Sequence, residues 1–329
     1  MTSGVLIAVV ESSQVGEARR RAAELGATVG FDATALGRLA IIATEAATNL
    51  VKHGRGGELF IGPAGARGVQ VIALDRGPGI GNVSASLRDG FSTAGTQGTG
   101  LGAIVRASSS FDVYSEPEFG TALAATVFAD GAGPPQVGGL AVPMRGESRC
   151  GDGWATWSAG ELTSIFMCDG LGHGAEAAEA TRVAIAAFRQ HAERPASAVI
   201  EMVLDAMRST RGGAVAVAEL DAREGRARYC GLGNIAALIL PPDDAPKHLV
   251  SHNGIAGHTR RRFQEFVYRW PPGSLLIMHS DGVGTSWNLD RYAGLRARRP
   301  DVIAGVLYRD AARGRDDATV VVARNGTGQ

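Results

Sequence analysis

The chain has 329 residues, of which 45% are hydrophobic and 20% charged, and its 33 basic and 33 acidic residues cancel. This balance gives no global field that would attract nucleic acid or an anionic membrane, so we expect neither as a partner. A chain of this length exceeds the size at which one hydrophobic core usually stops growing, which predicts two domains.

The three cysteines, Cys150, Cys168 and Cys230, lack CxxC spacing and form an odd set. This pattern argues against a disulfide framework and against a structural zinc site. The N-terminus has no basic region before a long apolar core, and no apolar run reaches membrane-spanning length. We therefore expect a soluble protein of the cytoplasm.

The first part of the chain mixes short apolar runs with helical patterns. Residues 5–10 are predicted to form a buried strand, and residues 14–25 a helix, because their apolar positions recur at helical spacing. A long helix is predicted next, with Asp32 as its N-cap and Gly54 just past its end. Strands 58–61 and 69–74 and a helix 103–109 complete this part.

Polar side chains interrupt the apolar pattern of the long helix. Glu45, Asn49 and His53 are each four residues apart, and this spacing places them on one helical face. The first two could meet a bound group together. The alternative is an ordinary solvated face.

Two glycine-bearing turns follow. Asp75 stands at a strand end before a turn that contains Gly77 and Gly79, and a glycine-rich stretch, residues 95–102, opens the next helix. Glycines let backbone amides approach an oligophosphate closely, and a helix N-terminus adds a favourable dipole. The stretch is not a Walker A sequence, because no lysine follows the glycines, nor is it a dinucleotide fingerprint after a first strand.

Three motifs occur along this part of the chain, in the order ExxxN, DxGxG and GTGLG. With them, nearly all of residues 1–128 resembles the ATP-binding GHKL superfamily, specifically its small anti-sigma-factor-type serine kinases of the RsbT and RsbW kind. The resemblance implies an α/β sandwich with a mixed sheet covered by helices. It implies that Asn49 holds Mg²⁺ against the phosphates of ATP, that Glu45 acts as a catalytic base or orients water, and that Asp75 accepts a hydrogen bond from adenine. The glycines would shape the adenine pocket or lie along the phosphates: Gly77 and Gly79 in the first role, and Gly98, Gly100 and Gly102, with Thr99, in the second.

Residues 130–139 are rich in glycine and proline and have almost nothing to bury, so we interpret them as a linker. We therefore predict an ATP-binding domain at 1–129 and a second domain at 140–329. The second domain has many short strand patterns and three helical ones, which suggests two antiparallel sheets packed face to face with helices outside. The predicted strands are 140–144, 154–158, 162–168, 214–220, 226–230, 235–240, 248–253, 263–268, 274–278 and 319–323, and the helices are 175–191, 196–207 and 301–313. The fold class is thus α+β, with two domains.

Four aspartates of the second domain each adjoin a strand-like run: Asp152, Asp169, Asp281 and Asp316. Carboxylate oxygens suit Mg²⁺ or Mn²⁺, and a pair of such ions can clamp a phosphate while activating a bridging water. The alternative is four unrelated turns on a surface.

The aspartates stand in four short motifs, in the order GD, DGLGHG, SDG and DDAT. With these motifs, residues 140–325 resemble the metal-dependent protein phosphatase (PPM) superfamily in its SpoIIE/RsbX-type branch. The resemblance implies a β-sandwich flanked by helices that binds two Mn²⁺ or Mg²⁺ ions. Asp317 ranks second as a ligand, and His173 is either a general acid or a residue that completes its turn. The resemblance implies that the metal ligands are Asp152, Asp169, the carbonyl of Gly170, Asp281 and Asp316. The four aspartates would also be the catalytic residues.

Together the two resemblances imply a phosphoserine/phosphothreonine phosphatase fused to an RsbT-like serine kinase module that uses ATP with Mg²⁺. The expected partner is a phosphorylated STAS-domain regulator, either an anti-sigma antagonist or a stressosome scaffold, in a bacterial partner-switching pathway. The alternative is a phosphatase whose ATP-binding module sequesters a partner without transferring phosphate.

Overall fold

The computed structural model describes residues 4–65, 67–87, 100–129, 136–258 and 263–326. Its contacts divide the chain into an N-terminal unit, Thr2–Pro135 with Leu289–Arg309, and a C-terminal unit, Gln136–Asn288 with Asp310–Gln329. Leu289–Arg309 therefore packs with the first unit, although the sequence-based boundaries place it in the second domain. Among the helices described, none is long and apolar enough to cross a membrane.

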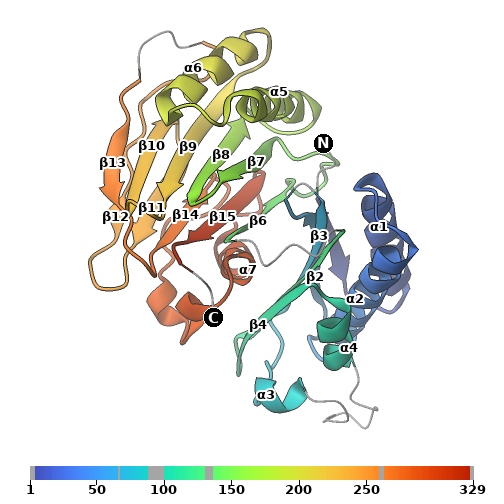
Figure 1. Ribbon diagram of the computed structural model, residues 1–329. Coiled ribbons are helices and arrows are strands. Elements are labelled where there is room, and N and C mark those ends of the chain that lie inside the picture. The colour runs from blue at the N-terminus through green and yellow to red at the C-terminus, as the bar shows by residue number, and fades with distance from the viewer. Residues whose placement is uncertain (1–3, 66, 88–99, 130–135, 259–262, 327–329) are drawn as a thin grey trace. The chain divides into compact units, whose positions relative to one another are not determined.

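One five-stranded sheet, in the order β1-β2-β3-β5-β4, forms the centre of the N-terminal unit (Figure 1). Each neighbouring pair is antiparallel, so the expectation of a mixed sheet was wrong. The reason is that the chain after β3 does not continue into the neighbouring strand of the sheet but into β4, one strand further out. The next strand, β5, then returns between β3 and β4 and runs antiparallel to both. The strands are β1 (Val5–Val9), β2 (Gly57–Pro63), β3 (Gly68–Leu74), β4 (Ser110–Glu116) and β5 (Gly120–Phe128).

Helices α1 (Ser13–Thr28), α2 (Ala33–Lys52) and α4 (Gly100–Ala107) pack against the sheet (Figure 1). Asp32 caps α2 as predicted, because its Oδ1 accepts a hydrogen bond from the Ala35 amide at 2.7 Å. Every residue of β3 is buried, so both faces of this strand are covered. The unit also contains the short helix α3 (Val83–Ser86), the 3₁₀ turns η2 (Leu289–Arg291) and η3 (Leu295–Ala297), and most of α7 (Pro300–Ala311).

The C-terminal unit contains two five-stranded antiparallel sheets, in the orders β13-β10-β9-β8-β7 and β12-β11-β14-β15-β6. The predicted sandwich is therefore present. The first sheet is made of β7 (Asp152–Ala159), β8 (Leu162–Gly170), β9 (Gly213–Asp221), β10 (Arg226–Leu232) and β13 (Phe266–Arg269). The second is made of β6 (Val137–Val142), β11 (Ala236–Leu240), β12 (Lys247–His248), β14 (Leu275–His279) and β15 (Ala318–Arg324).

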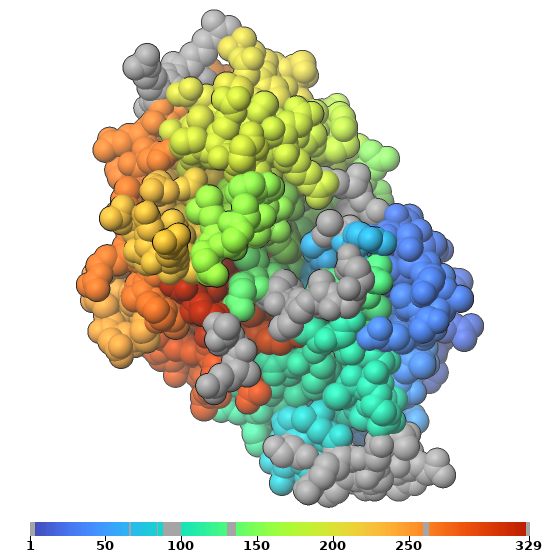
Figure 2. All heavy atoms as spheres, in the orientation of Figure 1, coloured from blue at the N-terminus to red at the C-terminus, as the bar shows by residue number. Residues whose placement is uncertain are grey.

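Alternation along β8 shows how the layers form. Ile165 and Met167 belong to a core shared by the two sheets, whereas Phe166 and Cys168 belong to a core under the helices α5 (Ala175–His191) and α6 (Ala196–Ala206). Phe166 stacks on Phe188 of α5, with ring centroids 5.1 Å apart. The helices form the outer layer of this unit, and their atoms lie at the surface in yellow-green and yellow in Figure 2.

One strand prediction was largely wrong. Residues 248–253 were expected to be a strand, but the strand β12 is limited to Lys247–His248, which pairs with β11. His252 forms an isolated parallel bridge with Leu232, and the other residues run as a loop. Single hydrogen bonds join this loop to neighbouring strands: the His252 amide donates to the Gly231 carbonyl of β10, and the Leu249 amide donates to the Ala237 carbonyl of β11.

Candidate nucleotide-binding and metal sites

Glu45 and Asn49 lie together at the N-terminus of α4. A Cβ atom placed on Gly100, the first residue of α4, would lie 3.0 Å from Glu45 Oε2 and 3.4 Å from Asn49 Oδ1. Two polar side chains of α2 thus lie beside the first turn of α4, and the N-terminus of a helix suits an anion. Gly102 is buried inside α4, and the predicted Gly98 and Thr99 lie outside the described residues.

Asp75 follows β3 directly, and its carboxylate is held by the backbone. Its Oδ1 atom accepts hydrogen bonds from the amides of Gly77 at 2.8 Å and Thr121 at 3.1 Å. Burial raises the pKa of this carboxyl group, and the two amides and the guanidinium of Arg309 partly oppose that rise. The side chain is therefore fixed in place before any ligand arrives.

The glycines around Asp75 are required by close backbone packing. Gly79 has φ +74°, and a Cβ there would lie 2.4 Å from the Glu116 carbonyl oxygen. A Cβ on Gly77 would lie 2.8 Å from the carbonyl oxygen of Gly54, and one on Gly54 would lie 2.9 Å from the Asp75 Cβ. The residue that follows α2 and the Asp75 turn are thus in direct contact.

In the C-terminal unit, Asp152 and Asp169 stand opposite each other in the register of β7 and β8. Asp152 is buried, and its Oδ2 atom has no hydrogen-bond partner in the described structure. Beside it, the Gly170 amide donates to the Gly151 carbonyl at 3.1 Å, which fixes the end of β8. A buried carboxylate oxygen without a donor is costly unless a cation binds it.

Asp281 and Asp316 reach the same place from the second sheet. Asp281 comes just after β14, and Asp316 just before its neighbour β15. Burial and, after it, the nearby carboxylates of Asp281 and Asp316 together raise the pKa of Asp169 to about 7. Burial and the Asp169 charge likewise raise the pKa of Asp152. The four predicted aspartates therefore form one cluster of mutually repelling groups.

Asp317 is engaged by the backbone instead. Its Oδ1 accepts from the Met144 amide at 2.7 Å and its Oδ2 from the Gly151 amide at 2.7 Å. These bonds tie the segment before β7 to the start of β15, so Asp317 holds the cluster's framework. His173 is partnered by Glu147, with 2.7 Å between Nδ1 and Oε1, a contact that neither of its two expected roles anticipated.

Sequence reasoning missed Asn234. Its Nδ2 donates to Asp281 Oδ2 at 2.6 Å, so this exposed amide orients one of the clustered carboxylates. The signal lies in strand pairing: Ala236 pairs with His279, which brings the residues just before β11 beside those just after β14.

The aspartate cluster fits divalent cations by its charge and burial. All of its donors are oxygens, which Mg²⁺ and Mn²⁺ prefer. In the described ranges no three His, Cys, Asp or Glu side chains already surround a common metal position. The observation that supports the fit is the donor-less Oδ2 atom of Asp152 amid neighbouring carboxylates.

Two antiparallel sheets with an aspartate cluster at their strand ends, covered by paired helices, define a protein phosphatase of the PPM class, here joined to a GHKL-type ATP-binding domain. The family model for Stage II sporulation protein E (SpoIIE) matches residues 159–325, just over half of the chain, and the chain belongs to this family. The model for the histidine kinase-like ATPase domain matches residues 9–127.

Individual relatives agree with this division. The serine/threonine-protein kinase RsbT of Bacillus subtilis (strain 168) is 31% identical over 111 residues, which cover 33% of this chain and 84% of RsbT. The phosphoserine phosphatase RsbX of the same organism is 22% identical over 138 residues, covering 42% of this chain and 69% of RsbX. A crystal structure of RsbX in complex with magnesium has a TM-score of 0.51 at 19% identity and covers 57% of this chain and 94% of that one. A structure described under the bacterial stressosome as a modular system for secondary messenger signalling has a TM-score of 0.53 at 27% identity, covering 57% and 98%.

Proposed function

We propose that this protein is a metal-dependent phosphoserine/phosphothreonine protein phosphatase whose N-terminal unit binds Mg·ATP and acts as an RsbT-like serine kinase. The observation that carries the proposal is the cluster of Asp152, Asp169, Asp281 and Asp316, in which burial and mutual repulsion raise the pKa values of the first two. Such a cluster is costly by itself, and divalent cations offset that cost.

The metal ligands would be Asp152, Asp169, Asp281, Asp316 and the carbonyl oxygen of Gly170. Two Mn²⁺ or Mg²⁺ ions at this place would supply Lewis acidity and a water of lowered pKa. The chain's own contribution is positioning. The β7 and β8 register holds one pair of carboxylates, the β14 and β15 neighbourhood holds the other, and Asn234 orients Asp281.

In the N-terminal unit, Asp75 would accept a hydrogen bond from the adenine amino group, with Gly77 and Gly79 shaping its surroundings. Asn49 would hold Mg²⁺ against the phosphates along Gly98, Thr99, Gly100 and Gly102, and Glu45 would act as base. The packing of Gly100 against Glu45 and Asn49 supports these roles. The sequence-based boundaries, 1–129 and 140–329, would then need two changes, because β6 begins at Val137, inside the expected linker, and Leu289–Arg309 belongs to the N-terminal unit.

The proposed substrate is a Ser/Thr-phosphorylated STAS-domain regulator, an anti-sigma antagonist or a stressosome scaffold, and the proposed location is the cytoplasm. The support is the pairing of an RsbX-like and an RsbT-like half on one chain, together with the stressosome structure among its neighbours. A kinase and a phosphatase on one chain would cycle phosphate futilely on a shared residue, so the two halves act on different targets or alternate.

Phosphate release from a phosphorylated STAS protein tests the phosphatase. We expect turnover with Mn²⁺, loss in EDTA, and loss in the Asp169→Ala variant. Arg189→Gln on the exposed face of α5 is the matched control and keeps wild-type turnover. Turnover that persists unchanged in EDTA rejects the proposal.

Labelled ATP tests the kinase role separately. Incubation with an unphosphorylated STAS protein is expected to transfer label, and Glu45→Ala to stop the transfer. Complex formation without transfer would favour the alternative in which the N-terminal unit only sequesters its partner.

A further inference from the structure

Helix α7 belongs to both compact units. Its residues 300–309 pack in the N-terminal unit, while its last two residues, Asp310 and Ala311, belong to the C-terminal unit. All residues from 300 to 309 are buried, including Asp301 and Arg309, so the helix is covered on all sides. Its sequence lies within the SpoIIE match, yet its contacts include the ATP-binding sheet.

At its C-terminal end, α7 is bonded to the turn that carries the adenine-binding carboxylate. The Nη1 atom of Arg309 donates to the Asp75 carbonyl at 3.0 Å, and the Arg309 carbonyl accepts a hydrogen bond from the Arg76 guanidinium. Arg309 is only 8% exposed, so these bonds are shielded from water. The Asp75 main chain is thus fixed by Thr121 on one side and by Arg309 on the other.

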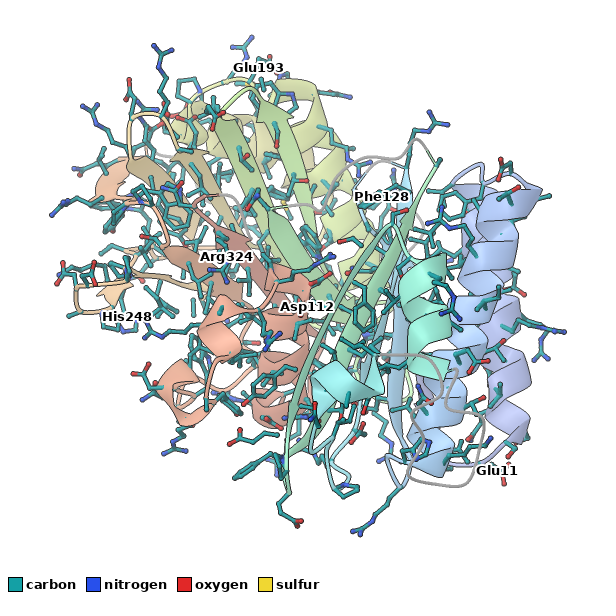
Figure 3. All side chains as sticks on the ribbon, turned by 60° about the horizontal axis from the view of Figure 1, so that its bottom comes forward. Glu11, Asp112, Phe128, Glu193, His248 and Arg324 are labelled. Atoms are coloured by element: carbon teal, nitrogen blue, oxygen red, sulfur yellow. The ribbon has the colours of Figure 1, made fainter. Side chains whose placement is uncertain are left out.

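At its N-terminal end, α7 is attached to β4. Asp112, labelled in Figure 3, accepts a hydrogen bond from the Arg299 amide at 2.7 Å through Oδ2, and its Oδ1 lies 3.4 Å from Arg298 Nη1. Between the two ends the helix approaches β3 closely, because a Cβ on Gly305 would lie 3.0 Å from Leu74 and 3.1 Å from Ile72. The helix is therefore anchored to β3 and β4 along its length.

Immediately beyond Arg309, the same backbone holds the segments next to two clustered aspartates. The Ala311 carbonyl accepts from the Gly284 amide at 2.8 Å, and the Arg313 amide donates to the Gly282 carbonyl at 2.8 Å. Val283 and Ala312 form an isolated antiparallel bridge. Gly282 follows Asp281 directly, and Arg313 precedes Asp316 by three residues.

We propose that Arg309 is a positioning residue for the adenine-binding Asp75 and that α7 couples nucleotide binding to the segments that carry Asp281 and Asp316. This inference rests on the proposed binding of ATP at Asp75. Adenine that engages the Asp75 carboxylate orders the turn to which Arg309 is bonded. Ordering Arg309 restrains Asp310 and Ala311 through a rigid helix, and this restrains the bridge at Val283 and Ala312. Because such coupling is reciprocal, metal binding at the aspartates strengthens nucleotide binding by the same factor.

Hydrogen exchange in the full chain at constant free Mg²⁺ tests the coupling without relying on catalysis. In the wild type, ATP is expected to slow exchange of peptides that cover residues 281–284 and 310–317 by about fivefold, the low end of usual coupling factors. Arg309→Gln is expected to weaken ATP binding about tenfold through the loss of a charge-assisted hydrogen bond, and to abolish the slowing when ATP is raised to saturate the variant. Arg309→Lys keeps the charge but not the planar fork, so it retains only part of the effect.

Two controls separate this inference from the proposed function. At an ATP concentration that occupies the wild type but leaves the more weakly binding Asp75→Asn variant largely empty, Asp75→Asn must show no slowing, and Arg189→Gln must behave as the wild type. If the wild type binds ATP and Asp75→Asn does not, yet exchange at 281–284 and 310–317 is unchanged by ATP, the coupling is wrong while the nucleotide site stands. If Asp75→Asn binds ATP as tightly as the wild type, the proposed nucleotide site itself is wrong. Where Arg309→Gln fails to fold, Arg309→Lys and the wild type still give the comparison.

Discussion

The carboxylate of Asp75 accepts two backbone N–H groups, whereas Asp152 has one oxygen that is buried without any hydrogen-bond partner in the described structure. Burial is the largest cause that raises the pKa at both residues. At Asp75 the amides and Arg309 oppose the rise. At Asp152 the hydroxyls of Ser280 and Thr319 oppose it, but the neighbouring charges of Asp169 and Asp317 add to it. At the proposed nucleotide site the protein itself thus supplies hydrogen-bond donors to the carboxylate. At the proposed metal site the carboxylates lack neighbouring positive charge, which a bound cation would provide.

This comparison predicts the largest effect at Asp152. Asp152→Asn is expected to reduce phosphatase turnover about a thousandfold, since metal ions contribute several kcal/mol of charge stabilisation to such reactions. The same change is expected to raise the melting temperature of the metal-free chain, because it removes one of the repelling charges. Phosphate release and thermal melting in EDTA are the measurements. A variant that melts at a lower temperature in EDTA would contradict the view that the cluster is strained by its own charge.

The second effect separates the two sites. Asp75→Asn is expected to weaken ATP binding about tenfold to a hundredfold, which corresponds to the loss of a hydrogen bond to a charged group. Phosphatase turnover measured without nucleotide should stay at the wild-type level, since no nucleotide-dependent contact is then affected. Calorimetry with Mg·ATP and phosphate release on the same preparations check this. Equal losses in both assays would show that the variant has a general folding defect.

Much of this comparison could be predicted from the sequence, for identifiable reasons. Helix 175–191 and the cap at Asp32 follow from local pattern and chemistry, which tertiary contacts did not override here. The aspartates at strand ends were predictable because each one lies in its apolar run or within two residues of it. Neighbours far apart in the sequence were not predictable, because they depend on which strands pair.

Two findings show that limit. The bond between Asn234 and Asp281 needs the register of β11 with β14, which no local pattern encodes. The pattern of residues 301–313 predicted a helix, and α7 is there, but a helix that is buried on all sides gives no sign of which sheet covers it. Its attachment to β3 and β4 is therefore visible only in the folded chain.

Asn234 provides the third prediction. Asn234→Ala is expected to weaken Mn²⁺ binding about tenfold, the lower end for residues that orient metal ligands from outside the ligand set. Turnover should return at saturating Mn²⁺, because the ligand itself remains. Mn²⁺ titration followed by electron paramagnetic resonance gives the affinity, and His248→Ala at an exposed position of the same unit is the control. A loss of turnover that excess Mn²⁺ does not restore would assign Asn234 a direct part in the chemistry.

The smallest expected effect tests the scaffold of the nucleotide site. Asp32 caps α2, the helix that carries Glu45 and Asn49, whereas Gly174 begins α5 with φ +77° and no side-chain cap. The helix nearest the aspartate cluster thus begins without a side-chain cap, where the loop from Asp169 needs glycine conformations. Asp32→Ala is expected to cost about 1 kcal/mol in the free energy of unfolding, measured from the first transition in urea. Because Asp32 contacts neither site, ATP affinity and phosphatase turnover at 25 °C should be unchanged. A loss of ATP affinity would mean that the start of α2 also positions Glu45 and Asn49, so that the nucleotide site depends on helix capping as well as on the turn at Asp75.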